Sequence, residues 1–217
     1  MAPSKNPNIQ EKLSRAIPCA TEAAAESRCR VVAPVVLCAV LALGLGCSGA
    51  ETDGGAPGGE QQPRVMTGMI EVHNRVRASV GVPPLTWSPT LASYAQAWAE
   101  HLASDGCRMV HRSHAGNNPL KAGENLYWAS PTRWSDGRSE PQRIAPEQPP
   151  AAWAGEGSDY DLGSNRCAEG KVCGHYTQMV WASSRQVGCG SQLCADGGQI
   201  WVCNYDPPGN WVGQRPY

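Results

Sequence analysis

The sequence of 217 residues contains no phenylalanine, although it has eight tryptophans, and it has no run of basic residues. Lys and Arg number 18 against 19 Asp and Glu, which gives a formal net charge of -1. A near-neutral chain without a basic patch has no electrostatic means of attracting the phosphates of DNA or RNA. We therefore exclude nucleic acid as a partner and expect binding to depend on a shaped pocket. The length has room for one domain plus a leader.

Long apolar runs are also scarce. The uncharged stretch Val31 to Gly46 is too short for a typical membrane span, but it suits the apolar part of a secretory signal. It runs into Cys47 through small residues and resembles a bacterial lipoprotein signal, so we expect cleavage before Cys47 and acylation of its side chain. A plain signal peptide cleaved nearby, or an uncleaved anchor, is the alternative.

The composition divides the chain into three parts. Residues 1–46 are expected to be a leader with a signal peptide, and residues 47–64 a flexible linker. The linker is rich in Gly, Pro, Ser and acidic residues, so it buries too little apolar surface to offset the entropy of ordering it. Residues 65–217 are expected to form the folded domain.

Helical spacing of apolar residues marks the start of this domain. The first helix is expected from Met66 to Val80, and the second begins at the N-cap Ser88 and ends at Gly106. Pro89 in the first turn of the second helix supports that start. A short third helix is expected over 153–160.

Three later segments have the pattern of strands. The apolar residues of 123–130 cluster as in a half-buried extended run, and 186–193 and 199–205 flank the sequence 195–198, whose glycines suit a hairpin. The stretch 173–181 fits either a strand or a helix. These patterns predict a small antiparallel sheet with helices packed on it.

Four of the ten cysteines lie in the leader or at its end, and six lie in the predicted domain. No two are spaced Cys-x-x-Cys, which disfavours a zinc cluster, and behind a secretory signal they indicate disulfides. Six cysteines allow 15 pairings. Cys167 and Cys173 flank a tight polar loop, and Cys189 and Cys203 lie on the two arms of the hairpin. Local geometry therefore favours these two pairs and leaves Cys107 for Cys194.

Five motifs in chain order resemble the CAP superfamily, which comprises cysteine-rich secretory proteins, antigen 5 and plant pathogenesis-related proteins. They are Cys107-x-x-x-His111, Gly123-Glu-Asn-Leu126, Trp153-x-x-Glu156, Gly174-His-Tyr-Thr-Gln-Met-Val-Trp181 and Cys203-Asn-Tyr-Asp-Pro-Pro-Gly-Asn210. The resemblance covers about Met66 to Tyr217, is closest to the plant branch, and with the lipoprotein-like signal suggests a bacterial member. It implies an α+β fold, a three-layer α-β-α sandwich stapled by the disulfides named above. It also implies a helix over 175–181.

The resemblance implies a metal site as well. In this family a central cleft holds two histidines and two glutamates, and the matching positions here are His111, Glu124, Glu156 and His175. Two imidazoles with two carboxylates suit Zn²⁺, or another divalent cation, as cofactor. The alternative is a hydrogen-bonded polar cluster without a metal. His114, in an unusual insertion beside the first motif, could replace His111.

A hydrolase would need a nucleophile, and Ser130 matches a serine that lies near the cleft in some relatives. Together with His111 and Glu124 it would form a triad-like set. The sequence has no Gly-x-Ser-x-Gly elbow, which weakens this interpretation. Other matching side chains are expected to orient the site rather than react: Asn125, Thr177 and Gln178. Those on the first helix are expected to join helix to sheet: His73, Asn74 and Arg77.

These observations predict a monomeric binding protein of the cell envelope or extracellular space, secreted or attached to the membrane only through a lipid anchor. The resemblance suggests a small lipid or sterol, a peptide or a cell-envelope component as ligand. The largely polar loop 131–150 argues against a sterol. A metal-dependent or serine hydrolase using the same cleft is the alternative, and a structural or adhesive surface protein is a third possibility.

Overall fold

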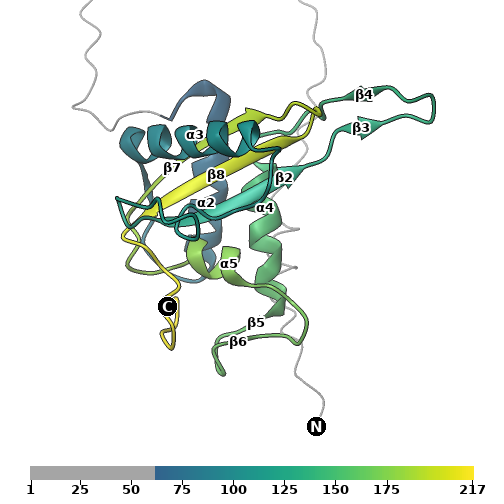
Figure 1. Ribbon diagram of the computed structural model, residues 1–217. Coiled ribbons are helices and arrows are strands. Elements are labelled where there is room, and N and C mark those ends of the chain that lie inside the picture. Colours follow the sequence, from purple (N-terminus) through teal and green to yellow (C-terminus); the bar gives the residue numbers. More distant parts are fainter. Residues whose placement is uncertain (1–61) are drawn as a thin grey trace, which may run out of the picture. The chain divides into compact units, whose positions relative to one another are not determined.

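The computed structural model describes residues 62–217 (Figure 1). The predicted leader, nearly all of the predicted linker and Cys47 lie outside these residues. The helices described are η1 (Arg64–Met66), α2 (Met69–Ser79), α3 (Pro89–Ser104), α4 (Gln148–Gly155), η2 (Glu156–Asp159) and α5 (Gly174–Met179). The strands are β1 (Thr86–Trp87), β2 (Gly123–Ala129), β3 (Thr132–Arg133), β4 (Ser139–Glu140), β5 (Tyr160–Asp161), β6 (Arg166–Cys167), β7 (Gln186–Leu193) and β8 (Gln199–Asp206).

The main sheet has the strand order β1-β7-β8-β2. Strands β7, β8 and β2 pair antiparallel, as predicted, and the short β1 adds a parallel strand at the other edge. In the β7–β8 hairpin Cys189 lies opposite Cys203, and in the β2–β8 pair Glu124 lies opposite Asn204. Strands β3 and β4 form a separate hairpin that projects away from the main sheet (Figure 1).

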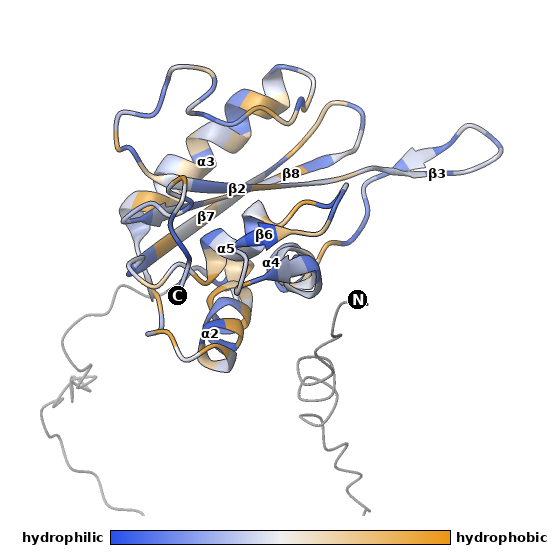
Figure 2. Cartoon of the chain, turned by 90° about the horizontal axis from the view of Figure 1, so that it is seen from below, coloured by the Kyte–Doolittle hydropathy of each residue, from blue (hydrophilic) through white to orange (hydrophobic). Residues whose placement is uncertain are grey.

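Helices cover both faces of this sheet, which confirms the three-layer α-β-α sandwich. Helix α3 lies on one face, and α2, α4 and α5 lie on the other (Figure 2). Because side chains alternate along a strand, β8 serves both cores. Ile200 and Val202 pack in the core under α3, whereas Trp201, Cys203 and Tyr205 pack in the core under α2, α4 and α5.

Helix α3 approaches the sheet closely because β7 carries glycine beneath it. A Cβ atom on Gly188 would lie 2.1 Å from the backbone nitrogen of Ala92, and one on Gly190 would lie 2.5 Å from Cα of Gln96. The helix begins as predicted: the hydroxyl of Ser88 accepts a hydrogen bond from the backbone N–H of Leu91 at 3.3 Å. The cap and the close packing on β7 together fix the position of α3, which lies beside part of the candidate site.

Buried polar side chains tie α2 to the rest of the domain. Arg77 is fully buried, and its guanidinium donates to the carbonyls of Pro83 (2.6 Å), Met179 (2.8 Å), Trp181 (3.0 Å) and Ser184 (3.0 Å). Burial lowers the pKa of Arg77 to about 10, so the side chain stays charged at neutral pH. The cation therefore holds the segment after α5 against α2.

Some boundaries differ from those the sequence predicts. Helix α2 starts at Met69 rather than Met66 because Gly68 has a φ of 97°, which separates η1 from the helix. Helix α4 starts earlier than expected, within the predicted loop 131–150, because Pro149 and Pro150 occupy its first turn, where no N–H is needed. The same loop also contains β3 and β4.

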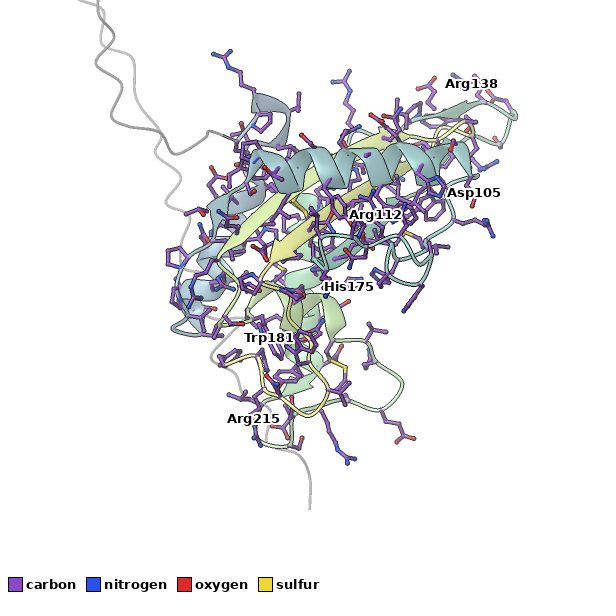
Figure 3. The ribbon with its side chains drawn as sticks, turned by 60° about the vertical axis from the view of Figure 1, so that its left-hand side comes forward. Asp105, Arg112, Arg138, His175, Trp181 and Arg215 are labelled. Carbon is purple, nitrogen blue, oxygen red and sulfur yellow. A yellow bond between two sulfur atoms is a disulfide. The ribbon has the colours of Figure 1, made fainter. Side chains whose placement is uncertain are left out.

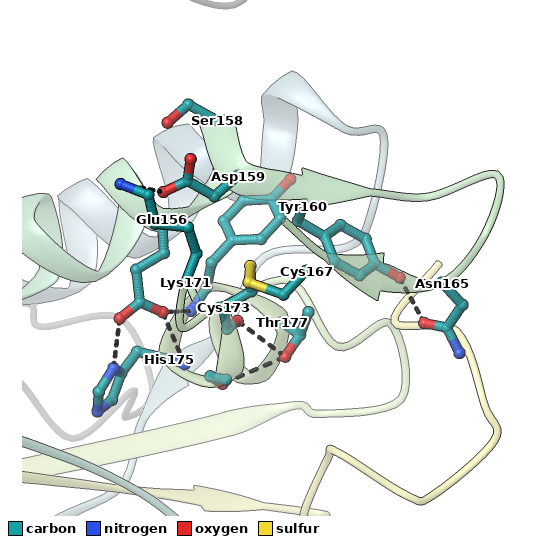
Figure 4. The surroundings of a disulfide bond; sticks show 12 residues. Glu156, Ser158, Asp159, Tyr160, Asn165, Cys167, Lys171, Cys173, His175 and Thr177 are labelled. Atoms are coloured by element: carbon teal, nitrogen blue, oxygen red, sulfur yellow. Dashed lines mark hydrogen bonds and ion pairs between the residues drawn. A yellow bond between two sulfur atoms is a disulfide. The ribbon is translucent and has the colours of Figure 1, made fainter. Parts of the chain in front are cut away.

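The structure confirms the predicted disulfides and their pairing. Cys107 bonds to Cys194, Cys167 to Cys173, and Cys189 to Cys203, with Cα–Cα distances of 5.9, 5.8 and 4.1 Å. The first of these joins the end of α3 to the β7–β8 turn, and the second closes the loop before α5 (Figure 4). None of the helices in residues 62–217 has the length and apolar character needed to cross a membrane.

Candidate functional site

The first half of the predicted site is a hydrogen-bonded pair formed by His111 and Glu124. Nδ1 of His111 lies 2.9 Å from Oε1 of Glu124, and the backbone N–H of Arg112 donates to the same oxygen at 2.9 Å. The Asn204 amide is 3.4 Å from Oε2. The Glu124 side chain is only 8% exposed, whereas that of His111 is 35% exposed. Since Nδ1 carries the hydrogen shared with the carboxylate, the neutral ring presents Nε2 as its free lone pair.

The second half repeats this arrangement with His175 and Glu156. Oε1 of Glu156 lies 2.6 Å from Nδ1 of His175, and Oε2 accepts from the backbone N–H groups of His175 (3.0 Å) and Tyr176 (3.2 Å) (Figure 4). The carboxylate thus satisfies N–H groups in the first turn of α5 as well as the imidazole. The His175 ring is stacked on Trp153, with ring centroids 6.1 Å apart and an interplanar angle of 18°. Its orientation is therefore set by two contacts.

The two pairs lie on opposite faces of β2. Glu124 shares a face with Leu126, which packs in the core under α3, and the next residue, Asn125, points to the other face. The Asn125 amide donates to the carbonyl of His175 at 3.0 Å. In Figure 3, Arg112, the neighbour of His111 in the chain, lies beside α3, and His175 lies on the side covered by α5.

The structure thus joins each predicted histidine to one predicted glutamate, which gives two separate His–Glu pairs. Within residues 62–217 no group of three or more His, Cys, Asp and Glu side chains is arranged to hold a metal ion. The convergence of all four residues on one cation stays a prediction. The donor chemistry nevertheless fits a metal, because a histidine whose Nδ1 donates to a carboxylate is the usual form of a histidine ligand.

A buried line of hydrogen bonds supports the His175 half. The Asn125 amide also donates to the hydroxyl oxygen of Tyr205 at 3.1 Å, and that hydroxyl lies 2.8 Å from Nε2 of His73. Nδ1 of His73 in turn donates to the carbonyl of Met69 at 2.7 Å. Burial lowers the pKa of His73 to about 4 and raises the pKa of Tyr205, so both side chains are neutral at neutral pH. The line connects the backbone of His175 to α2.

Thr177 and Gln178 make their contacts with the C-terminal segment. The Thr177 hydroxyl donates to Oδ1 of Asn210 at 2.7 Å, and Oε1 of Gln178 accepts from the backbone N–H of Gly209 at 3.0 Å. Gln178 also packs against Gly123, the first residue of β2. Both side chains therefore hold α5 between the C-terminal segment and β2.

Ser130 lies away from the His111–Glu124 pair. It follows the last residue of β2 and is exposed, and its contacts are with Gln142. Glu124 is six positions earlier on the same regular strand, which at about 3.3 Å per residue places the two residues roughly 20 Å apart. The structure does not assemble Ser130, His111 and Glu124 into a triad, because an extended strand separates the serine from the pair.

Two shallow, open hollows lie on the surface of the described residues, and neither is lined by a residue of a His–Glu pair. One of about 330 Å³ lies between α5 and the C-terminal segment, and its lining residues include Tyr160, Thr177, Trp181, Asn210 and Trp211. The other, of about 370 Å³, lies between η1 and α3. Neither hollow can be predicted from local sequence patterns, because each is formed by segments far apart in the chain.

The fold agrees with comparisons to known proteins. The family model for the cysteine-rich secretory protein family, CAP, matches residues 70–205. Pathogenesis-related protein 1C of Nicotiana tabacum is 45% identical over 148 residues, covering 68% of this chain and 78% of its own. Pathogenesis-related leaf protein 4 of Solanum lycopersicum is 43% identical over 148 residues, covering 68% of this chain and 80% of its own.

A solved structure is similar in fold. Venom allergen-like protein 4 of Schistosoma mansoni aligns with a TM-score of 0.52 and 26% identity, over 72% of this chain and 95% of its own. The chain therefore belongs to the cysteine-rich secretory protein (CAP) family. Within it, the chain is similar to the pathogenesis-related proteins of plants.

Proposed function

We propose that this protein is an exported CAP-domain binding protein whose two His–Glu pairs bind a divalent cation, with Zn²⁺ as the best fit. One observation carries the proposal. Each carboxylate is engaged by N–H donors of its own surroundings, and Nε2 of His111 and of His175 has no hydrogen-bond partner among the described residues. The rings are oriented by their Nδ1 atoms and keep Nε2 available.

This arrangement gives the four residues different roles. His111 and His175 would bind the cation through Nε2, and Glu124 and Glu156 would hold the rings and balance the positive charge. A bound Zn²⁺ would supply a positive centre that attracts an anionic group of a ligand. The ligand classes that suit an exported protein of this kind are a small lipid, a peptide or another component of the cell envelope.

The geometry favours binding over hydrolysis. Both glutamates accept hydrogen bonds from backbone N–H groups, so neither carboxylate is free to act as a general base without losing them. Ser130 lies too far along β2 to be activated by His111. We therefore treat a hydrolase as the second candidate function. If the protein hydrolyses ester or peptide substrates at all, the rate should be the same in Ser130→Ala.

The test of the cation site is a Zn²⁺ titration of the purified, metal-stripped protein by calorimetry. His111→Ala and His175→Ala should each remove most of the binding, and Glu156→Gln should weaken it about 10- to 100-fold through loss of ring orientation. Glu169→Gln, which changes an exposed carboxylate outside both pairs, is the matched control and should bind as the unaltered protein does. Equal affinity in all variants would rule out this site.

Export and anchoring form a separate part of the proposal. The apolar stretch before Cys47 and the three disulfides support a route through an oxidising compartment. We propose a bacterial lipoprotein in which an acylated Cys47 tethers a monomeric domain at the cell envelope. Mass spectrometry of the mature N-terminus decides this, since an unmodified start at any other residue contradicts the lipid anchor.

A further inference from the structure

The hollow between α5 and the C-terminal segment has no charged side chain in its lining. Its residues carry aromatic rings, amides, a hydroxyl, or no polar side chain at all, and Asp, Glu, Lys, Arg and His are absent from them. The guanidinium of Arg215, in the same C-terminal segment, donates to the carbonyls of Leu162 (2.9 Å) and Gly163 (2.8 Å). A hollow without charge favours a neutral ligand, because an ion would give up hydration there without meeting a counter-charge.

Two tryptophans contribute to this hollow in different ways. Trp181 is 4% exposed, and a Cβ atom on Gly209 would lie 2.6 Å from its Cγ, so the C-terminal segment packs directly on this ring. Trp211 is 56% exposed. A turn holds its backbone, because the N–H of Gln214 donates to the carbonyl of Trp211 at 3.0 Å. The hollow therefore has a large aromatic surface that is still open to a ligand.

Two asparagine amides in the lining are held in place and keep part of their hydrogen-bonding capacity. Oδ1 of Asn165 accepts from the hydroxyl of Tyr160 at 2.7 Å, and its Nδ2 donates to the carbonyl of Gln214 at 3.0 Å (Figure 4). Asn210 accepts from the hydroxyl of Thr177 at 2.7 Å and donates to the carbonyl of the first residue of α5 at 2.8 Å. Since an amide has two N–H donors and two acceptor lone pairs, each keeps one of both kinds within residues 62–217.

We propose that this hollow binds a neutral sugar ring of a glycan chain. One face of a pyranose ring consists of C–H groups, whose partial positive charge suits the negative face of an indole. Each sugar hydroxyl both donates and accepts a hydrogen bond, as the two amides do. Trp211 would therefore cover the face of the ring, and Asn165 and Asn210 would bind its hydroxyl groups.

The size and openness of the hollow favour a sugar over a lipid. Its volume of about 330 Å³ is at the lower end of the range of ligand sites, roughly 300–1,000 Å³. One ring of a longer chain fits such a hollow while the neighbouring rings stay in solvent, whereas an acyl chain would leave much of its apolar surface in water. The site shares no lining residue with the His–Glu pairs and does not depend on a bound cation.

Saturation-transfer NMR on the purified protein tests this proposal with three neutral trisaccharides: cellotriose, maltotriose and triacetylchitotriose. The measurements are made in EDTA, so that the result does not depend on the proposed cation site. We expect transfer to the ring C–H protons of at least one sugar, which also shows whether the site prefers a β-linked, an α-linked or an acetylated chain. Trp211→Ala should weaken that binding at least about tenfold.

Trp134→Ala is the matched control, because Trp134 is 46% exposed and lies in the β3–β4 hairpin, outside the hollow. It should bind the sugar as the unaltered protein does, and thermal unfolding shows whether either variant has lost its fold. Equal losses in the two folded variants, or no transfer to any of the three sugars, would overturn the proposal. Equal binding of a neutral peptide, acetyl-trialanine amide, would overturn it as well. A failed Zn²⁺ titration would contradict only the cation site.

Discussion

The hydroxyl of Tyr205 donates a hydrogen bond of 2.8 Å to Nε2 of His73, and both side chains are fully buried in the core. The direction of the bond follows from Nδ1 of His73, which must carry the hydrogen because its partner is the Met69 carbonyl. The same hydroxyl oxygen accepts from Asn125, which holds the backbone of His175. A structural hydrogen bond thus supports one half of the candidate site.

Removing this hydroxyl should destabilise the domain. Tyr205→Phe leaves the buried Nε2 of His73 without a donor and one amide hydrogen of Asn125 without this acceptor, which should lower the free energy of unfolding by about 1–3 kcal/mol. Urea denaturation measures the change. Tyr127→Phe removes a hydroxyl that makes no hydrogen bond within residues 62–217 and should be nearly neutral; equal losses in the two variants would contradict the role of the buried line.

The stability of the protein should fall as the pH drops from about 6.5 to about 4. His73 has a pKa lowered from 6.5 to about 4 by burial, so in this range the unfolded chain binds a proton that the folded protein excludes. The stability that neutral His73 contributes is fully present above the pKa of 6.5 that this histidine has in the unfolded chain. Acidification to about pH 4 removes this contribution, which amounts to at most about 3 kcal/mol.

Urea denaturation at several pH values between 7.5 and 4.5 measures this dependence. In His73→Gln the pH dependence of the free energy of unfolding should be shallower by up to about 1.4 kcal/mol per pH unit, whatever the variant costs in absolute stability. A slope identical to that of the unaltered protein would show that another group is responsible.

Replacing Arg77 by any other residue should greatly reduce the free energy of unfolding. Arg77→Lys keeps the charge, but one ammonium group cannot reach all four carbonyls that the guanidinium contacts. We expect a loss of about 2–4 kcal/mol in the free energy of unfolding, since buried carbonyls are left unpaired. Arg75→Lys, an exposed change two positions away on α2, is the control and should stay within about 0.5 kcal/mol.

The close approach of α3 to β7 predicts a sharp difference between two glycines. Gly188→Ala would place a methyl group 2.1 Å from a backbone nitrogen of α3, so α3 must move away from the sheet. We expect a loss of about 2–4 kcal/mol in thermal or urea unfolding. Gly155→Ala, at the end of α4, meets nothing within 4 Å and should be neutral or slightly stabilising. Similar losses in both would contradict the packing argument.

Much of the fold can be predicted from local patterns. The Ser88 cap, the helical spacing after it and the alternation around the hairpin at 195–198 led to α3, β7 and β8 with nearly correct bounds. Strand β1 was missed because two residues, Thr86 and Trp87, carry no periodicity. The pattern predicts the start of helix α4 too late, because Pro149 and Pro150 are typical of a loop, although the first turn of a helix also tolerates proline.

The candidate site was less predictable. The resemblance named His111, Glu124, Glu156 and His175, but no spacing could show that they form two pairs on opposite faces of β2. The stacking of Trp153 on His175 and the engagement of Glu156 by the first turn of α5 depend on tertiary packing alone. The sequence indicates His114 only as a substitute for His111, because the turn that places the two rings side by side has no sequence pattern of its own.

Burial on both faces of β8 limits how this protein can change. Six consecutive residues, Ile200–Tyr205, are buried, and they face two different cores in alternation. A random mutational library should therefore yield almost no tolerated charged substitutions across this run, since every position lacks contact with solvent. Sequence variation has to enter instead through the exposed connections around the sheet, such as the loop that joins α3 to β2.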